Sequence, residues 1–98
     1  MCEVLIVDGE YMMVRAKGHA TGSEACCNGI STLLYSLAGF LKNDQRAHVD
    51  ELTLEEADAH IVFTGAKWAK GALEMTKIGF LQLEKAYPEC LRVEILEK

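Results

Sequence analysis

Residues 18–31 read Gly18-His19-Ala20-Thr21-Gly22-Ser23-Glu24-Ala25-Cys26-Cys27-Asn28-Gly29-Ile30-Ser31. This stretch lies between a strand-like N-terminus and the first long helical pattern. A histidine ends the extended part, and Cys27 follows eight positions later, where the helix should begin. Helix N-termini and a neighbouring imidazolium both lower a cysteine pKa, and the thiolate is the nucleophile. The stretch therefore predicts a nucleophile, Cys27, and a general base, His19.

Two short apolar runs precede this stretch and flank the dipeptide Asp8-Gly9. Cys2–Val7 and Tyr11–Ala16 are predicted strands, because Asp-Gly between such runs is a strong hairpin signal. The second strand of this hairpin delivers His19 just past its end.

From Ser23 to about Lys42 the apolar pattern is helical. Ser23 or Thr21 can serve as the N-cap, and Thr21 with Glu24 fits a capping box.

The phase of this helix separates the two adjacent thiols. At about 100° per residue, one face holds the following side chains: Cys26, Ile30, Leu33, Leu37 and Leu41. Cys27 lies on the shoulder of that face, in line with Ser31, Leu34 and Ala38. We therefore expect Cys26 to point into the core, with Leu33 and Leu37 buried beside it, and Cys27 to point toward the loop that carries His19.

The second half of the chain predicts two strands, a helix and a last strand. The strands are Val49–Glu55 and His60–Thr64, and because Val49 falls out of step, the first has a bulge or starts later. Ile61–Phe63 is apolar on both faces and predicts a central strand. The helix is Lys67–Tyr87, stopped by Pro88, with one apolar side made of Ala72, Met75, Gly79 and Leu83. The last strand is Cys90–Leu96.

The resulting order is ββαββαβ, with no repeat or linker, so residues 1–98 are predicted to form one α+β domain. Two helices should pack on a small sheet.

Composition excludes several function classes. The net charge is −5 and no Lys/Arg cluster exceeds two neighbours, which argues against a nucleic-acid surface. No apolar run approaches the roughly 20 residues that cross a bilayer. The four cysteines form no disulfide framework, and the chain opens into a strand rather than a signal peptide. A reduced, cytoplasmic protein is expected.

Each candidate residue also has a purely structural interpretation. Free cysteines are among the most buried residues, and His19 could simply hydrogen-bond backbone at a strand end. His48 and His60 are interpreted as surface or sheet-face residues. Adjacent cysteines are poorly placed to bind one zinc ion in tetrahedral geometry, and the chain has no C-x₂₋₄-C pair. We therefore expect no metal and no cofactor.

Gly18-His19-Ala20, together with Cys27 and Ser31 four positions on, resembles the signature of the ribosomal-processing cysteine proteases, the Prp family. The loop between histidine and cysteine is several residues shorter here, and Glu24 stands where that family has Asp. The resemblance implies a homodimeric cysteine endopeptidase with a Cys27/His19 dyad, in which Gly18, Ala20 and Ser31 contact the substrate. It also implies the substrate: the N-terminal extension of a large-subunit ribosomal protein, cut after bulky aromatic residues and before a small one.

Two other functions fit the same residues. A non-catalytic dimeric module that binds peptides or assists ribosome assembly would keep the fold, and the short loop favours it. A thiol redox switch would use Cys26 and Cys27 together.

Overall fold

The structure is a computed structural model that describes residues 1–44, 46–65 and 67–98. Seven elements follow one another along the chain: β1 (Cys2–Asp8), β2 (Met12–Lys17), α1 (Glu24–Asn43), β3 (His48–Glu55), β4 (Asp58–Thr64), α2 (Lys67–Ala86) and β5 (Leu91–Glu97). The predicted ββαββαβ order and the α+β class are confirmed, and most boundaries agree within one or two residues.

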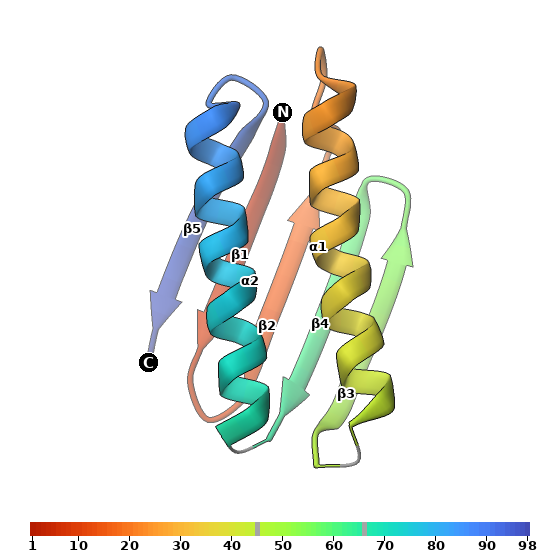
Figure 1. Ribbon diagram of the computed structural model, residues 1–98, viewed down its shortest axis with the longest axis vertical. Helices are drawn as coiled ribbons and strands as arrows, with labels where there is room; N and C mark the ends of the chain where they lie inside the picture. Colours follow the sequence, from red (N-terminus) through yellow and green to blue (C-terminus); the bar gives the residue numbers. More distant parts are fainter. Residues whose placement is uncertain (45, 66) are drawn as a thin grey trace.

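The strands form one sheet in the order β3-β4-β2-β1-β5. β1 pairs with β5 in parallel, whereas the other three pairings are antiparallel. Both helices lie side by side on one face of this sheet (Figure 1). The β1–β2 hairpin is therefore central, the β3–β4 hairpin flanks it on one side, and β5 flanks it on the other.

The core lies between the sheet and the two helices, as the alternating burial of the strands requires. Five of its largest side chains are fully enclosed: Phe63, Phe80, Ile6, Met12 and Ile61. β4 lies inside the sheet, as its apolar run predicted, and the predicted irregularity in β3 is a register shift between Val49 and Glu51.

Helix α1 begins where its sequence predicted, but only one of the two candidate caps is used. The Ser23 hydroxyl accepts a hydrogen bond from the Cys26 N–H at 3.1 Å, which makes Ser23 the N-cap. Thr21 instead donates its hydroxyl to the His19 carbonyl at 3.3 Å, within the preceding loop. The predicted capping box of Thr21 with Glu24 is therefore wrong, because Glu24 is already the first helical residue.

The buried side of α1 is rotated slightly from the predicted face. Cys26, Leu37 and the other predicted core residues are buried, but Leu33 is only half-buried and packs toward α2. A Cβ built on Gly79 would lie 2.5 Å from a Leu33 methyl group, so the glycine makes room for that side chain. Leu34 and Ala38 complete the core face in its place.

The predicted apolar side of α2 is only partly correct, because Ala72 and Leu83 pack against the core but the fully buried residues lie on a neighbouring side. Its buried residues are Ala69, Leu73, Thr76, Lys77 and Phe80, whereas Met75 is 75% exposed. Gly79 and Leu83 of the predicted side lie at the contact with α1 instead. The periodicity was misread because the true core side includes a threonine and a lysine. Thr76 is accommodated because its hydroxyl donates to the Ala72 carbonyl at 2.8 Å.

Lys77 is buried because its ammonium group meets several carboxylates. Its Nζ lies 2.8 Å from Glu74, 3.3 Å from Asp8 and 3.4 Å from Glu97. Lys70 reaches the same Asp8 at 3.1 Å. Burying a charge is tolerated only with such partners. Their hydrogen bonds, Glu74 foremost, raise the pKa of Lys77 and keep it charged.

Asp8 makes the stability of the fold depend on acid pH. Hydrogen bonds from Lys70 first, and also from Lys77, lower the pKa of this carboxyl below its ordinary 3.8. A carboxyl whose pKa falls on folding stabilises the protein above its unfolded pKa, and this contribution is lost as the pH drops through the folded pKa. We expect the free energy of unfolding to fall less in Asp8→Asn than in the wild type between about pH 6 and about pH 2.5. Urea denaturation at the two pH values measures this, and equal falls would contradict it.

Candidate active site

The position of His19 is set by Gly18, the first residue after β2. Gly18 has φ +89°, and a Cβ there would lie 2.6 Å from the Met1 carbonyl oxygen, so a larger residue cannot adopt this backbone without displacing its neighbours. Its N–H donates to the Ala57 carbonyl at 3.0 Å. The chain is therefore fixed to the N-terminus and to the β3–β4 turn immediately before His19.

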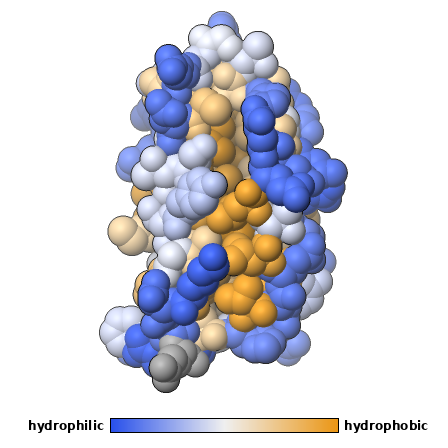
Figure 2. Space-filling model, turned by 90° about the vertical axis from the view of Figure 1, so that its right-hand side faces the viewer, coloured by the Kyte–Doolittle hydropathy of each residue, from blue (hydrophilic) through white to orange (hydrophobic). Residues whose placement is uncertain are grey.

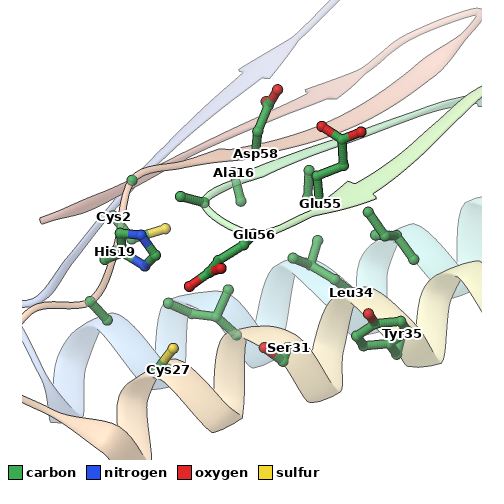
Figure 3. A pocket seen from close by; sticks show the side chains of 16 residues that line it. Cys2, Ala16, His19, Cys27, Ser31, Leu34, Tyr35, Glu55, Glu56 and Asp58 are labelled. Atoms are coloured by element: carbon green, nitrogen blue, oxygen red, sulfur yellow. The ribbon is translucent and has the colours of Figure 1, made fainter.

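The rest of the loop is held by its own backbone and by one thiol. The Thr21 N–H donates to the His19 carbonyl at 2.9 Å, and Ala20 is buried. The Cys90 thiol, in the turn just before β5, donates a hydrogen bond to the Thr21 carbonyl at 3.3 Å. These contacts place the exposed His19 ring above the first turn of α1 (Figure 3).

All five residues predicted for the site line one pocket of about 270 Å³: Gly18, His19, Ala20, Cys27 and Ser31. Cys27 lies in the first turn of α1 and Ser31 follows it one turn later, while His19 faces them from the opposite wall (Figure 3). The structure thus brings together residues from a loop and a helix that only spacing had connected.

His19 and Cys27 share the pocket, and no hydrogen bond between their side chains is found in the described residues. Both side chains are exposed. Catalytic hydrogen bonds are often long in free enzymes and shorten when substrate binds. An imidazole and an exposed thiol therefore face one another across the pocket.

Among the described residues that line the pocket, Cys27 is the one with an exposed thiol. Burial raises the pKa of Cys2 to about 11 and also raises the pKa of Cys26, so both stay protonated near neutral pH. Cys26 is fully buried, as predicted, whereas Cys27 is exposed and lines the same pocket as His19.

We expect limiting iodoacetamide near pH 7 to label Cys27 well before Cys26, because alkylation requires an accessible thiolate. Peptide mass spectrometry after a time course measures the order. Cys90 is the internal comparison, since it is half-buried and its thiol donates a hydrogen bond to the Thr21 carbonyl. Labelling of Cys26 first, or of both at the same slow rate, would contradict the assignment of the nucleophile.

Sequence reasoning missed the third wall of the pocket. The wall is formed by the end of β3, the turn after it and the start of β4: Leu54, Glu55, Glu56, Ala57 and Asp58. Figure 3 shows the Glu56 carboxylate pointing into the space between the loop and α1. The acidic run was visible in the sequence, but nothing in its local pattern placed it beside Cys27, about thirty residues earlier. Only the pairing of β2 with β4 brings the two together.

Two further properties bear on the kind of site. In residues 1–44, 46–65 and 67–98, no cluster of three or more His, Cys, Asp or Glu side chains is arranged to hold a metal ion. No helix in the same ranges has the length and apolarity needed to span a membrane.

By sequence, the chain matches no protein-family model and no curated protein. Its fold is similar to that of solved structures. The essential ribosomal processing protease Prp from S. aureus, in complex with a covalently linked product peptide, superposes with a TM-score of 0.83 at 19% identity, over 97% of this chain and 99% of that chain. The same protease with a substrate peptide gives 0.74 at 17% identity, with the same coverage.

SMU.848 from Streptococcus mutans gives a TM-score of 0.77 at 19% identity, over 100% of this chain and 99% of that chain. At these identities the likeness establishes a shared fold over the whole chain, and the resemblance stated from residues 18–31 is supported at the level of the fold.

Proposed function

We propose that this chain is a cysteine endopeptidase in which Cys27 is the nucleophile and His19 the general base. The observation that carries the proposal is the shared pocket, in which an exposed thiol at a helix N-terminus faces an imidazole. The Prp fold supports it, because one solved relative holds a product peptide covalently. Ser31, Gly18 and Ala20 are proposed to contact the substrate backbone beside the dyad.

The chemistry follows from these two groups. His19 takes the proton of the Cys27 thiol, and the thiolate attacks the scissile carbonyl carbon. Backbone N–H groups at the start of α1 stabilise the oxyanion. His19 then gives its proton to the leaving amine as the C–N bond breaks. Water hydrolyses the remaining thioester and restores the thiol.

The substrate is proposed to be the N-terminal extension of a large-subunit ribosomal protein, in the cytoplasm, and the active form a homodimer. The complexes of the ribosomal processing protease with peptides support a peptide substrate of this kind. Light scattering on the purified protein would measure the assembly against the 10.8 kDa mass of one chain.

The test is cleavage of the host's own extension. The protein is incubated with the full ribosomal protein, and the products are identified by mass spectrometry, with Cys27→Ala as the control. A single cut that the Cys27→Ala variant does not make supports the proposal. No cut by either protein would overturn it.

One observation favours a second candidate, a non-catalytic peptide-binding or assembly module. His19 and Cys27 make no direct hydrogen bond in the described part of the chain, and the loop between them is short. Peptide binding without cleavage would select this alternative. The redox switch is disfavoured, because Cys26 is fully buried and points away from the pocket that Cys27 lines.

A further inference from the structure

We propose that the substrate binds as an added strand along the free edge of β3, over the apolar channel between β3 and α1. The site selects an extended peptide that carries apolar side chains and basic residues. This inference rests on the proposed peptidase function, and it specifies where on this chain the peptide lies and which chemistry it has.

The two edges of the sheet differ in their free hydrogen-bonding groups. At the β5 edge, Val93 donates its N–H to the Glu84 carboxylate of α2 at 2.7 Å, so a side chain already occupies this edge. β3 is the other outer strand. Within the described ranges, no side chain or loop hydrogen-bonds to the backbone of His48–Glu55. In an antiparallel pair, every second residue of an edge strand directs its N–H and C=O outward, which is the template for an added strand.

The free edge lies beside exposed apolar surface. Leu52 and Leu54 pair with the buried Ile61 and Ala59 of β4, so their side chains point to the helix layer. Both are nevertheless only half-buried, because α1 does not cover them completely. Figure 2 shows the result, an apolar strip that runs along this side of the molecule between polar borders. An added strand would cover this strip with alternate side chains.

This apolar strip between β3 and α1, the channel named above, is continuous with the candidate active site. Leu54 of β3 and Leu34 and Tyr35 of α1 line the same pocket as Cys27 and His19. β3 also runs toward that pocket, since its last residue, Glu55, lies in the pocket wall (Figures 1 and 3). A peptide paired with β3 therefore extends into the space between the nucleophile and the base.

The charge of the protein is concentrated on the same hairpin. No Lys or Arg occurs between Arg46 and Lys67, while five acidic residues do: Asp50, Glu51, Glu55, Glu56 and Asp58. The other ten acidic residues are balanced by the ten Lys and Arg of the chain, so this hairpin accounts for the whole net charge of −5.

Two of the five carboxylates are paired with histidines. Asp50 lies 3.1 Å from His48, and Glu51 lies 2.9 Å from His60. The remaining three line the pocket, and no ion pair to them occurs in the described residues. Negative charges grouped on a partly enclosed surface attract a cationic ligand and repel an anionic one. The same charges discourage pairing between two copies of the β3 edge.

Binding is tested with the intact Cys27→Ala protein, which cannot consume the peptide. The probe is a synthetic peptide of the host's ribosomal-protein extension that spans the cut, with a matched peptide in which every Lys and Arg is Gln. Titration calorimetry gives the affinities, and amide shifts in NMR spectra locate the peptide. We expect shifts along β3 and the pocket, and binding at least about tenfold weaker for the Gln peptide at low salt.

Two pairs of variants in the same background separate the contributions. Leu52→Asp should weaken binding of the basic peptide at least about tenfold, whereas Leu96→Asp on β5 should leave it unchanged. Glu55→Gln with Glu56→Gln should weaken the basic peptide and spare the Gln peptide. The control, Glu89→Gln with Glu94→Gln, should do neither. Thermal unfolding shows whether each variant is folded. The NMR mapping uses the Cys27→Ala protein alone and needs none of these further substitutions.

The outcomes distinguish this inference from the proposed function. Shifts confined to β5, or equal affinity for both peptides, would overturn the β3 site. The same holds if wild-type and Leu52→Asp proteins with an intact Cys27 cleave with equal kcat/KM, although the peptidase assignment would then stand. Binding along β3 without any wild-type cleavage would overturn the peptidase assignment while confirming the site.

Discussion

Replacing either Cys27 or His19 by alanine is expected to lower kcat/KM for peptide cleavage at least about a thousandfold. Cys27→Ser should be nearly as poor, because the hydroxyl is a far weaker acid than the thiol and the same base cannot activate it equally. Both side chains are exposed, so their removal should leave the thermal midpoint almost unchanged. Progress curves on a fluorogenic peptide, with unfolding scans of each variant, measure both quantities.

The double variant is the sharper measurement. Residues that act as one unit are strongly non-additive, so Cys27→Ala with His19→Ala should be no slower than either single variant. His60→Ala is the matched control. This histidine lies on the other side of the sheet, paired with Glu51, and outside the pocket, so cleavage should persist. If the fold-loss in kcat/KM of the double variant equals the product of the two single losses, His19 and Cys27 do not work together.

The choice between the two adjacent thiols was predictable because it needs only local information. A helix that starts at a serine cap turns 100° per residue, and this alone sends Cys26 into the core and Cys27 to its border. An irregularity near the start of β3 was predictable for the same reason, since Val49 breaks the alternation of a strand. Such patterns depend on neighbours in the sequence.

The features that were predicted wrongly or missed depend on residues that are neighbours in space but not in the sequence. The core face of α2 was misread because Lys77 is buried by carboxylates from β1 and β5, which no helical periodicity can anticipate. Leu33 leaves the sheet-facing core because Gly79 of the other helix opens a space for it. In the same way, Glu56 reaches the pocket only through the pairing of β2 with β4.

The rotated face of α1 leads to the second large effect, a loss of about 2–5 kcal/mol in the free energy of unfolding for Leu37→Ala. Leu37 is 3% exposed and belongs to the core cluster, so the truncation removes apolar contacts and leaves a cavity that its neighbours fill only in part. Denaturant titration measures the loss. The slope m of the unfolding free energy against denaturant concentration should stay constant, because the variant should expose the same surface on unfolding.

Leu33→Ala is the matched control, because it removes the same atoms one helical turn earlier on the same helix. Leu33 is only half-buried, and its methyl groups lie over Gly79 at the border of the two helices, where the surface can close around a smaller side chain. Its loss should therefore be clearly smaller than that of Leu37→Ala. Equal losses would mean that Leu33 shares the sheet-facing core, and the whole helix would then be turned toward the predicted phase.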